Sequence, residues 1–384
     1  MALIDLWKRS REELAGKRLA QIIGLAGSGK LRDDNDASQE FRHLLSNVPT
    51  DLLVEYADQC LSDKFDDSGL ALQDIVNQLG KRLGFSTTEG RYRGTTSQIG
   101  FDGIWRSPEA HSLIVEVKTT DAYRIDLNVI AGYRRALIAE DKVSEEESSM
   151  LIVVGRQDTG DLEAQIRGSK HAWDVRLISL DALCRLVKLK EKLEDPATVG
   201  KVYDVLMPRE FTKVDGIIDL VFSTTEEARE ETEPLEDEEE GPQFVPVNFH
   251  EACARRIEKS LGVSLIRLTK ASFTNSEAAI TVVCAVSREY TTQRGPGYWF
   301  AFHPHQRALL AKAAKPYVAF GCASAETLLL IPFGQFDSWI SGFNTTTTDD
   351  GRMYWHVHLR RESKGMLLNR KKGFDRIDVS SYLI

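Results

Sequence analysis

Several features are scarce or missing in this 384-residue sequence, and each absence excludes a class of protein. No run of about eighteen apolar residues occurs, so we expect no membrane-spanning helix and no membrane partner. The five cysteines are an odd number, lie far apart and form no CxxC pair, which disfavours a disulfide framework and a thiolate metal site. The N-terminal stretch lacks the apolar core of a signal peptide. The sequence therefore predicts a cytoplasmic protein with buried free thiols.

Acidic residues outnumber basic residues, 58 to 49, so the chain as a whole carries a net charge of −9, but the charge is unevenly distributed. Residues 244–384 hold 18 Lys and Arg against 11 Asp and Glu, whereas residues 223–243 hold ten acids and one arginine. Electrostatic steering depends on local patches rather than on the total charge. The basic C-terminal third therefore remains a candidate for binding an anionic partner.

The acidic segment Ser223–Gln243 also marks a domain boundary. Its like charges repel and little of it can be buried, which predicts a disordered or solvated linker. We expect a helical extension over 1–65, a mixed α/β domain over 66–222, the linker over 223–243 and a separate strand-rich α+β domain over 244–384.

Hydrophobic periodicity predicts the elements of both domains. Upstream of the linker, helices are expected over 10–26, 37–48, 50–65, 69–83, 126–139, 160–170 and 181–194, and strands over 85–92, 99–105, 112–119, 150–155 and 174–180. Downstream, strands are expected over 263–271, 278–287, 298–303, 317–323, 327–333, 353–360 and 365–370, and helices over 303–314 and 334–343. Three hairpin-type strands followed by alternating helices and strands imply a mixed sheet with helices on its faces.

The stretch GLAGSGKL, residues 24–31, nearly matches a phosphate-binding loop. Such a loop needs a preceding buried strand and a hydroxyl side chain after its lysine. Here Leu31 takes the hydroxyl position and the lead-in is helical. We interpret the stretch as a glycine-rich turn between helices and expect no nucleotide cofactor.

Two His-x-His pairs occur in the C-terminal part, His303 with His305 and His356 with His358. Four imidazoles on paired strands could bind zinc. Pro304 and the onset of a helix disfavour that geometry for the first pair, so histidines in a polar groove or in the core are the favoured interpretation.

The stretch FDGIWRSPEAHSLIVEVKTT, residues 101–120, predicts a hairpin that carries unexpected charges. Because side chains alternate along a strand, Ile114, Glu116 and Lys118 share one face. An edge strand with one solvated face would explain these charges. The alternative is a site, because Asp102 lies on the neighbouring strand.

Two carboxylates and an ammonium group in one pocket suit phosphodiester hydrolysis. Mg²⁺ takes oxygen ligands, commonly one or two carboxylates plus the substrate phosphate. The metal makes a better nucleophile of water and neutralises the phosphate, while a lysine such as Lys118 positions the water or stabilises the developing charge. Asp74, on the helix before the hairpin, could supply a further carboxylate.

This arrangement resembles the PD-(D/E)XK nuclease superfamily, with its restriction-endonuclease-like fold, over about residues 69–180. The resemblance rests on the FD and EVK motifs of the hairpin and on the order helix, three strands, helix, strand. It implies that Asp102 and Glu116 hold Mg²⁺ or Mn²⁺ and that Lys118 serves the attacking water. Asp74 would stand where the family often has a longer glutamate.

The resemblance predicts a metal-dependent endonuclease that cleaves DNA, in restriction, antiviral defence or repair. Arg134, Gln165, Arg167 and Lys170 are expected to contact nucleic acid. Cleavage of both strands by one site per chain suggests a homodimer. The alternative is a non-catalytic DNA-binding or assembly protein that uses the nuclease-like fold as a scaffold; in that case Lys118 would lie in solvent or in an ion pair remote from Asp102.

The basic C-terminal domain interleaves aromatic residues with cations, a composition typical of nucleic-acid recognition. We expect this domain to select the target of the nuclease, with a protein-binding or dimerising role as the alternative. Most of its aromatic residues lie in predicted strands and are expected in the core: Tyr298, Trp299, Phe300, Tyr354 and Trp355.

Overall fold

The computed structural model describes residues 3–63, 65–92, 99–119, 125–155, 160–207, 246–292, 295–347, 353–362 and 365–384. These residues form two compact units: unit 1 holds 3–193 and 197–207, and unit 2 holds 194–196 and 246–384. Unit 1 thus contains both the expected helical extension and the expected α/β domain. The acidic segment 223–243 lies outside the described residues.

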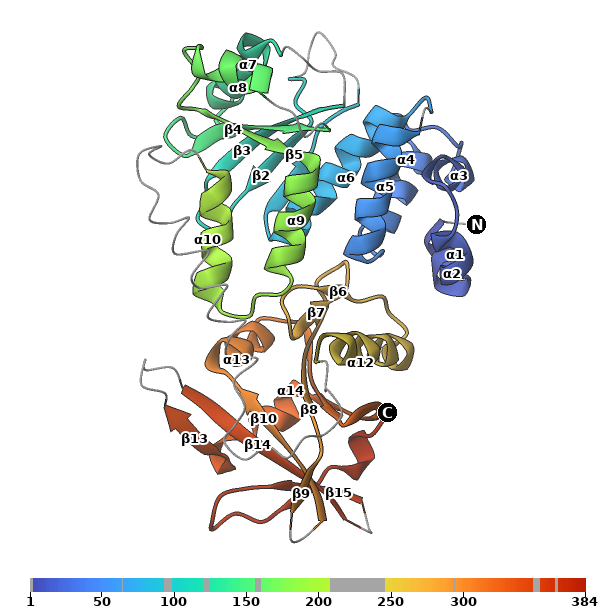
Figure 1. Cartoon of the computed structure of the whole chain (residues 1–384), viewed down its shortest axis with the longest axis vertical. Coiled ribbons are helices and arrows are strands. Elements are labelled where there is room, and N and C mark those ends of the chain that lie inside the picture. The colour runs from blue at the N-terminus through green and yellow to red at the C-terminus, as the bar shows by residue number, and fades with distance from the viewer. Residues whose placement is uncertain are drawn as a thin grey trace. The chain divides into compact units, whose positions relative to one another are not determined.

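Unit 1 consists of a sheet and its surrounding helices (Figure 1). Its helices are α1 (Leu3–Arg9), α2 (Arg11–Ala15), α3 (Leu19–Leu25), α4 (Asp36–Leu45), α5 (Thr50–Ser62), α6 (Ser68–Leu83), α7 (Leu127–Ala139), α8 (Gly160–Arg167), α9 (Leu180–Lys190) and α10 (Pro196–Leu206). Its strands are β1 (Ser86–Glu89), β2 (Gly103–Arg106), β3 (Ser112–Lys118), β4 (Ser148–Val154) and β5 (Val175–Ser179).

The five strands lie in the order β1-β2-β3-β4-β5. The β1–β2 and β2–β3 pairs are antiparallel, while β3–β4 and β4–β5 are parallel, with α7 and α8 as the crossover helices. Every residue of β4 is buried, as expected for a central strand covered on both faces. The mixed sheet with helices is therefore confirmed as α/β.

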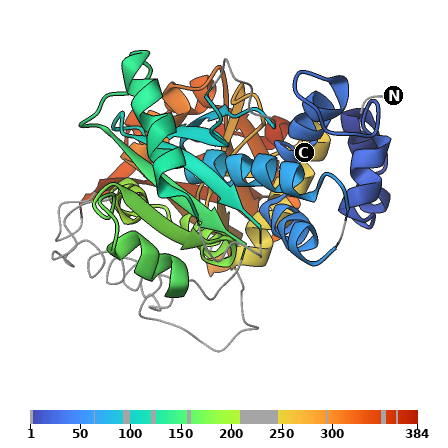
Figure 2. The same cartoon turned by 90° about the horizontal axis from the view of Figure 1, so that it is seen from above.

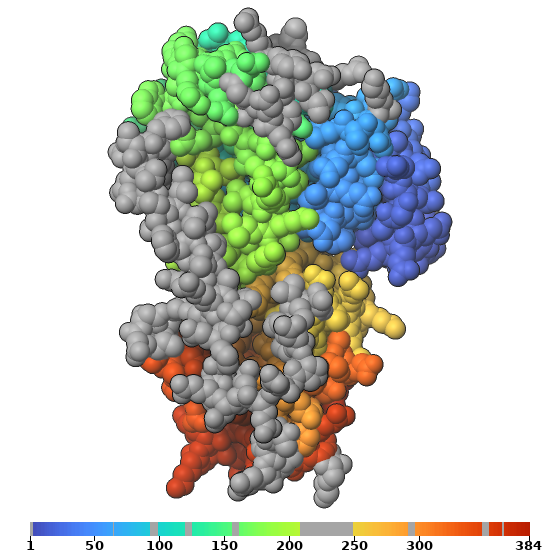
Figure 3. Space-filling model, viewed as in Figure 1, coloured from blue at the N-terminus to red at the C-terminus, as the bar shows by residue number. Residues whose placement is uncertain are grey.

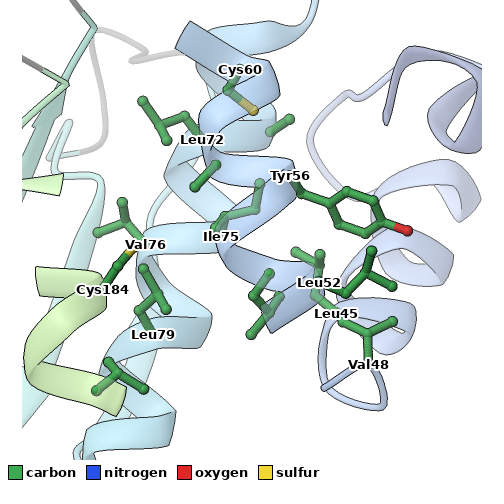
Figure 4. Close-up of a cluster of buried hydrophobic side chains, with 14 of the residues drawn as sticks. Leu45, Val48, Leu52, Tyr56, Cys60, Leu72, Ile75, Val76, Leu79 and Cys184 are labelled. Carbon is green, nitrogen blue, oxygen red and sulfur yellow. The ribbon is translucent and has the colours of Figure 1, made fainter. Parts of the chain in front are cut away.

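One face of this sheet packs on the helical part of unit 1. Leu113, Val115 and Val153 join a single apolar cluster with residues of α1, α4, α5, α6 and α9. Figure 4 shows side chains of α5, α6 and α9 meeting in this cluster. Figure 3 shows the blue atoms of the N-terminal helices as one continuous surface beside α6. Because the helical extension shares this core, it is expected to unfold together with the sheet.

The opposite face of the sheet packs on the crossover helices. Ile114, Ile152 and Val154 cluster with Ile130 of α7 and Leu162 of α8. Helix α6, light blue beside the strands in Figure 2, belongs instead to the first face, where it packs with Leu113 and Val115. The predicted alternation along β3 is confirmed, since Ile114 and Val115 belong to clusters on opposite faces.

Unit 2 contains two sheets and few helices. Its helices are α12 (Pro246–Leu261), α13 (Pro304–Ala311), α14 (Phe333–Asp337), η1 (Ile340–Gly342) and η2 (Ser380–Tyr382). Its strands are β6 (Ile266–Arg267), β7 (Ser272–Thr274), β8 (Ile280–Ser287), β9 (Tyr290–Thr292), β10 (Gly295–Phe302), β11 (Lys315–Cys322), β12 (Ser324–Pro332), β13 (Asn344–Thr347), β14 (Met353–Glu362), β15 (Gly365–Asn369) and β16 (Ile377–Asp378).

The two sheets of unit 2 pack face to face around an aromatic core. One has the order β16-β15-β14-β10-β9, with β13 also paired to β14, and the other has the order β12-β11-β8-β7-β6. Phe300 of β10 packs on Phe320 of β11, with ring centroids 4.9 Å apart, and Phe336 of α14 joins them. Helix α12 covers the second sheet through Phe249 and Ile257.

The structure corrects several element boundaries. The helix predicted over 10–26 is two helices, because Gly16 caps α2 and the extended backbone of Arg18 starts α3. Pro196 begins α10, a helix that was not predicted, and a missing N–H costs nothing at that position. The strand predicted over 263–271 is reduced to β6, and α12 was missed altogether.

Other expectations are confirmed. Residues 26–31 form a turn between α3, which ends at Leu25, and α4, with Gly27 and Gly29 at positive φ, and a helix rather than a strand precedes the turn. All five cysteines are free and buried. Among the described residues, we find no helix with the length and apolarity needed to cross a membrane.

Candidate active site

The β2–β3 hairpin places Asp102 beside Glu116. Gly103 lies opposite Val115 in the register, and the Asp102 backbone N–H donates to the Val115 carbonyl at 3.2 Å. The Asp102 side chain turns back onto β3, where its Oδ2 accepts from the Val117 N–H at 2.7 Å. Asp102 is therefore fixed by the neighbouring strand at both its backbone and its carboxylate.

Glu116 and Lys118 form an ion pair within the same site. Lys118 Nζ lies 2.5 Å from Glu116 Oε1, on the face of β3 that they share. Glu116 is 8% exposed, whereas the Lys118 side chain is 38% exposed. The lysine thus lies between a buried carboxylate and solvent, where a phosphate could approach.

Electrostatics couple the three groups. Burial, and then the negative charge of Glu116, raise the pKa of Asp102 to about 7, although the Val117 N–H and Lys118 oppose the rise. Burial lowers the pKa of Lys118, but the hydrogen bond and charge of Glu116, with a contribution from Asp102, raise it above its ordinary value overall. The Lys118 ion pair is therefore not remote from Asp102.

Tyr133 of α7 is a fourth group at this site. Burial raises its pKa, and the charges of Glu116 and Asp102 raise it further while Lys118 lowers it. Tyr133 lies on the helix predicted over 126–139. Its position one helical turn after Ile130, which packs on the same sheet face, is the signal that could have placed it.

Helix α6 braces the Asp102 backbone. The Asp102 carbonyl accepts from Asn77 Nδ2 at 2.9 Å, from Gln73 Nε2 at 3.2 Å and from the Gly90 N–H at 3.0 Å. Asn77 Oδ1 in turn accepts from Trp105 Nε1 at 2.9 Å. Sequence reasoning missed this brace. Its only signal is that two polar residues four positions apart lie on the buried face of an amphipathic helix.

Glycine is required at position 103 by this brace. A Cβ there would lie 2.1 Å from Asn77 Oδ1, so Asn77 would have to move and lose its bonds to Trp105 and to Asp102. We expect Gly103→Ala to lower the free energy of unfolding by roughly 2 kcal/mol, since two buried hydrogen bonds are disturbed. Thermal unfolding followed by circular dichroism measures the change.

The matched control is Gly200→Ala in α10, where no atom lies within 4 Å of the added Cβ. Alanine is favoured over glycine inside a helix, so this variant should be neutral or slightly more stable. Equal thermal stability of the two variants would contradict the bracing role of Asn77.

Asp74 lies in a different cluster from the hairpin acids. Its Oδ1 accepts from Arg42 Nε at 2.9 Å, and its Oδ2 accepts from the Tyr92 hydroxyl. Burial raises the pKa of Asp74 to about 7, against the opposing charge of Arg42. Asp74 is not among the groups that shift the pKa of Asp102. The structure therefore joins Asp102 with Glu116 and leaves Asp74 apart.

In the described part of the chain, no cluster of three or more His, Cys, Asp or Glu side chains is arranged to hold a metal. A pair of carboxylates nevertheless fits Mg²⁺, which usually keeps several waters and takes one or two protein carboxylates plus substrate oxygens. Asp102 and Glu116 form such a pair.

The predicted nucleic-acid-binding residues have different surroundings. Arg134 is largely buried and bonds Ser148 Oγ and the Glu145 carbonyl, and Gln165 bonds the Ile125 backbone, so both have contacts within the chain. The exposed residues are Arg167, which pairs with Glu163, and Lys170, which lines a shallow pocket with Gln165 and His171. A nucleic-acid role for any of the four remains a prediction.

One histidine of each pair, His356 and His305, contacts other groups of the protein. His356 accepts at Nδ1 from Trp299 Nε1 at 3.0 Å, and its Nε2 lies 2.6 Å from Thr346 Oγ1. His305 Nε2 lies 3.4 Å from Glu194. These contacts agree with histidines in a polar groove.

Neither a protein-family model nor a curated protein matches this chain. The functional argument therefore depends on the geometry of the site itself.

Proposed function

We propose that this chain is a metal-dependent endonuclease of the PD-(D/E)XK type. The observation that carries the proposal is the coupled set Asp102, Glu116 and Lys118 on one hairpin, with the pKa of Asp102 raised to about 7. Strongly shifted pKa values at convergent groups are typical of functional sites. A surface ion pair on an edge strand would not need a buried second acid beside it.

The order of the strands supports the finer fold assignment. Two antiparallel pairs, β1–β2 and β2–β3, lead into two parallel pairs, β3–β4 and β4–β5, with α6 before them and α7 between β3 and β4. This is the element order on which the resemblance rests. Glu116 lies on β3, and Asp102 lies immediately before β2 rather than on the strand where the resemblance put it, since β2 begins at Gly103.

Each residue has a role that follows from its surroundings. Asp102 and Glu116 would hold Mg²⁺ or Mn²⁺, which when bound activates water and neutralises the scissile phosphate. Lys118 neutralises Glu116 in the free site and, once that carboxylate holds a cation, can orient water or contact phosphate. Tyr133 can donate a hydrogen bond, because a tyrosine hydroxyl is protonated at neutral pH and burial and the nearby carboxylates raise its pKa further. DNA is the proposed substrate.

The scaffold alternative is favoured by one observation, the closed ion pair between Lys118 and Glu116. In that case the hairpin charges would stabilise the fold and no cleavage would occur. Incubation of supercoiled and linear plasmid, methylated and unmethylated, with Mg²⁺ or Mn²⁺ separates the two. Cutting or nicking that stops in EDTA supports the nuclease, and intact DNA on every substrate supports the scaffold.

A further inference from the structure

The outer face of the larger sheet in unit 2 carries a row of rings. Trp299 of β10 and Tyr354, His356 and His358 of β14 follow one another with centroids 6.1 Å, 5.0 Å and 5.9 Å apart. The two strands are antiparallel neighbours (Figure 1), and Trp299 lies opposite His358 in the register. We call these four residues the ring row.

Strand alternation accounts for the position of the ring row. On β14, Val357 and Leu359 belong to the aromatic core, so the residues between them point to the other face. On β10, Tyr298 and Phe300 are buried in that core, which turns Trp299 outward. All four rings are half-buried, and in the described residues neither Trp299 nor Tyr354 joins an apolar cluster. Trp299 and Tyr354 were both expected in the core, but neither is part of it.

Hydrogen bonds fix two rings of the row, Trp299 and His356, whereas Tyr354 and His358 keep polar atoms available. His356 is held from both sides by Trp299 and Thr346. Within the described part of the chain, the Tyr354 hydroxyl and the His358 ring have no hydrogen-bond partner. The row is therefore held in place at Trp299 and His356, and a ligand can bond to Tyr354 and His358 on either side of His356.

Arg360, two positions after His358, is the next residue on the same face of β14. Its Nε is buried without a hydrogen-bond partner, and among the described residues its guanidinium has no ion pair. That Nε is shielded from solvent, so an approaching phosphate would contact the terminal nitrogens of this half-buried guanidinium, which has no acidic partner in that part of the chain. Glu362, the acid that follows on this face, is paired with Arg376 and does not compete for Arg360.

We propose that the ring row and Arg360 bind single-stranded nucleic acid. Bases stack on exposed aromatic and imidazole rings regardless of sequence, while a cation beside them takes the backbone phosphate. The excess of Lys and Arg in residues 244–384 complements that backbone. A duplex hides its base faces, so rings would gain little from it. The inference deepens the proposed nuclease by assigning its substrate contact, but binding itself does not depend on cleavage.

The test is fluorescence anisotropy of the full chain in EDTA, with a labelled single-stranded oligonucleotide and the same sequence as a duplex. We expect Tyr354→Ala to weaken single-strand binding about tenfold or more, since stacking on one ring is worth roughly 1–3 kcal/mol. Tyr354→Phe keeps the ring and should keep the affinity. Arg360→Gln should weaken binding and lower the slope of log Kd against log salt by about one.

Lys312→Gln is the matched control, because it removes the same charge from an exposed position of unit 2 at the C-terminal end of α13, outside strands β10 and β14. Unchanged affinity in Tyr354→Ala and Arg360→Gln, losses equal to that of Lys312→Gln, or equal losses on duplex and single strand would each overturn the inference. Since EDTA removes metal, a protein that never cleaves DNA can still pass this test, and a nuclease can fail it.

Discussion

Replacing Asp102 by asparagine should abolish cleavage and at the same time raise thermal stability. Asparagine keeps an oxygen that can accept from the Val117 N–H but removes the charge that burial and Glu116 disfavour. A shift of the Asp102 pKa from 3.8 to about 7 corresponds to a gain on the order of 2–4 kcal/mol in the variant at pH 8. Differential scanning calorimetry in EDTA measures this gain.

The pH dependence of that gain follows from the direction of the shift. Between about pH 4 and pH 7 folded Asp102 retains its proton while the unfolded carboxyl has lost it, so the stability of the native protein falls as the pH rises. The advantage of Asp102→Asn should therefore be largest at pH 8 and vanish near pH 4. Asp66→Asn, at an exposed position, should show no such profile. A variant that melts below the native protein at pH 8 would show that Asp102 is not an electrostatic cost.

Replacing Lys118 by alanine should lower the first-order rate of plasmid cleavage by about 10²–10³-fold. The ammonium group contacts Glu116, and its positive charge also lowers the pKa of Asp102, so it acts on both carboxylates of the site. DNA affinity in EDTA should change little, because the loss concerns the reacting phosphate. Single-turnover kinetics with excess enzyme separate the chemical step from binding.

Lys142→Ala provides a matched control in the same unit. Lys142 pairs with Glu140, also two positions away, at 2.6 Å, but both side chains are more than half exposed. Its removal should leave the cleavage rate within about twofold. If both lysine variants cleave at the native rate, Lys118 has only a structural role.

The sequence was sufficient to predict the hairpin and its shared face because strand alternation is a local rule. Ile114 and Val115 do lie on opposite faces, and Asp102 does meet Glu116 through the pairing of β2 with β3. The apolar run at residues 150–154 likewise predicted a buried strand, which is β4. Local patterns of this kind need no knowledge of distant residues.

The surroundings that the sequence did not predict are set by contacts between residues far apart in the chain. Helical spacing placed Asp74 on the helix before the hairpin, but the side chain pairs with Arg42, 32 residues earlier in the sequence. Arg134 was expected to meet phosphate; it bonds the Ser148 hydroxyl and the Glu145 carbonyl near the start of β4, and its nucleic-acid role stays a prediction. The brace by Asn77 also joins elements that are distant in the sequence.

The aromatic residues of unit 2 illustrate the same limit. Their strands were predicted correctly, but which face of β14 points outward depends on the second sheet that packs on Val357 and Leu359. No local pattern specifies that second sheet. The ring row could therefore be recognised only in the folded unit.

The most direct test of the account is a Mn²⁺ titration of the native chain, Glu116→Gln and Glu140→Gln, followed by electron paramagnetic resonance at pH 6 and pH 8. The account predicts a Mn²⁺ site lost in Glu116→Gln, kept in Glu140→Gln, and roughly tenfold weaker at pH 6, because Asp102 must lose its proton with a pKa of about 7. Equal Mn²⁺ binding by the native chain and Glu116→Gln, or no pH dependence, would contradict a metal-dependent site at this hairpin.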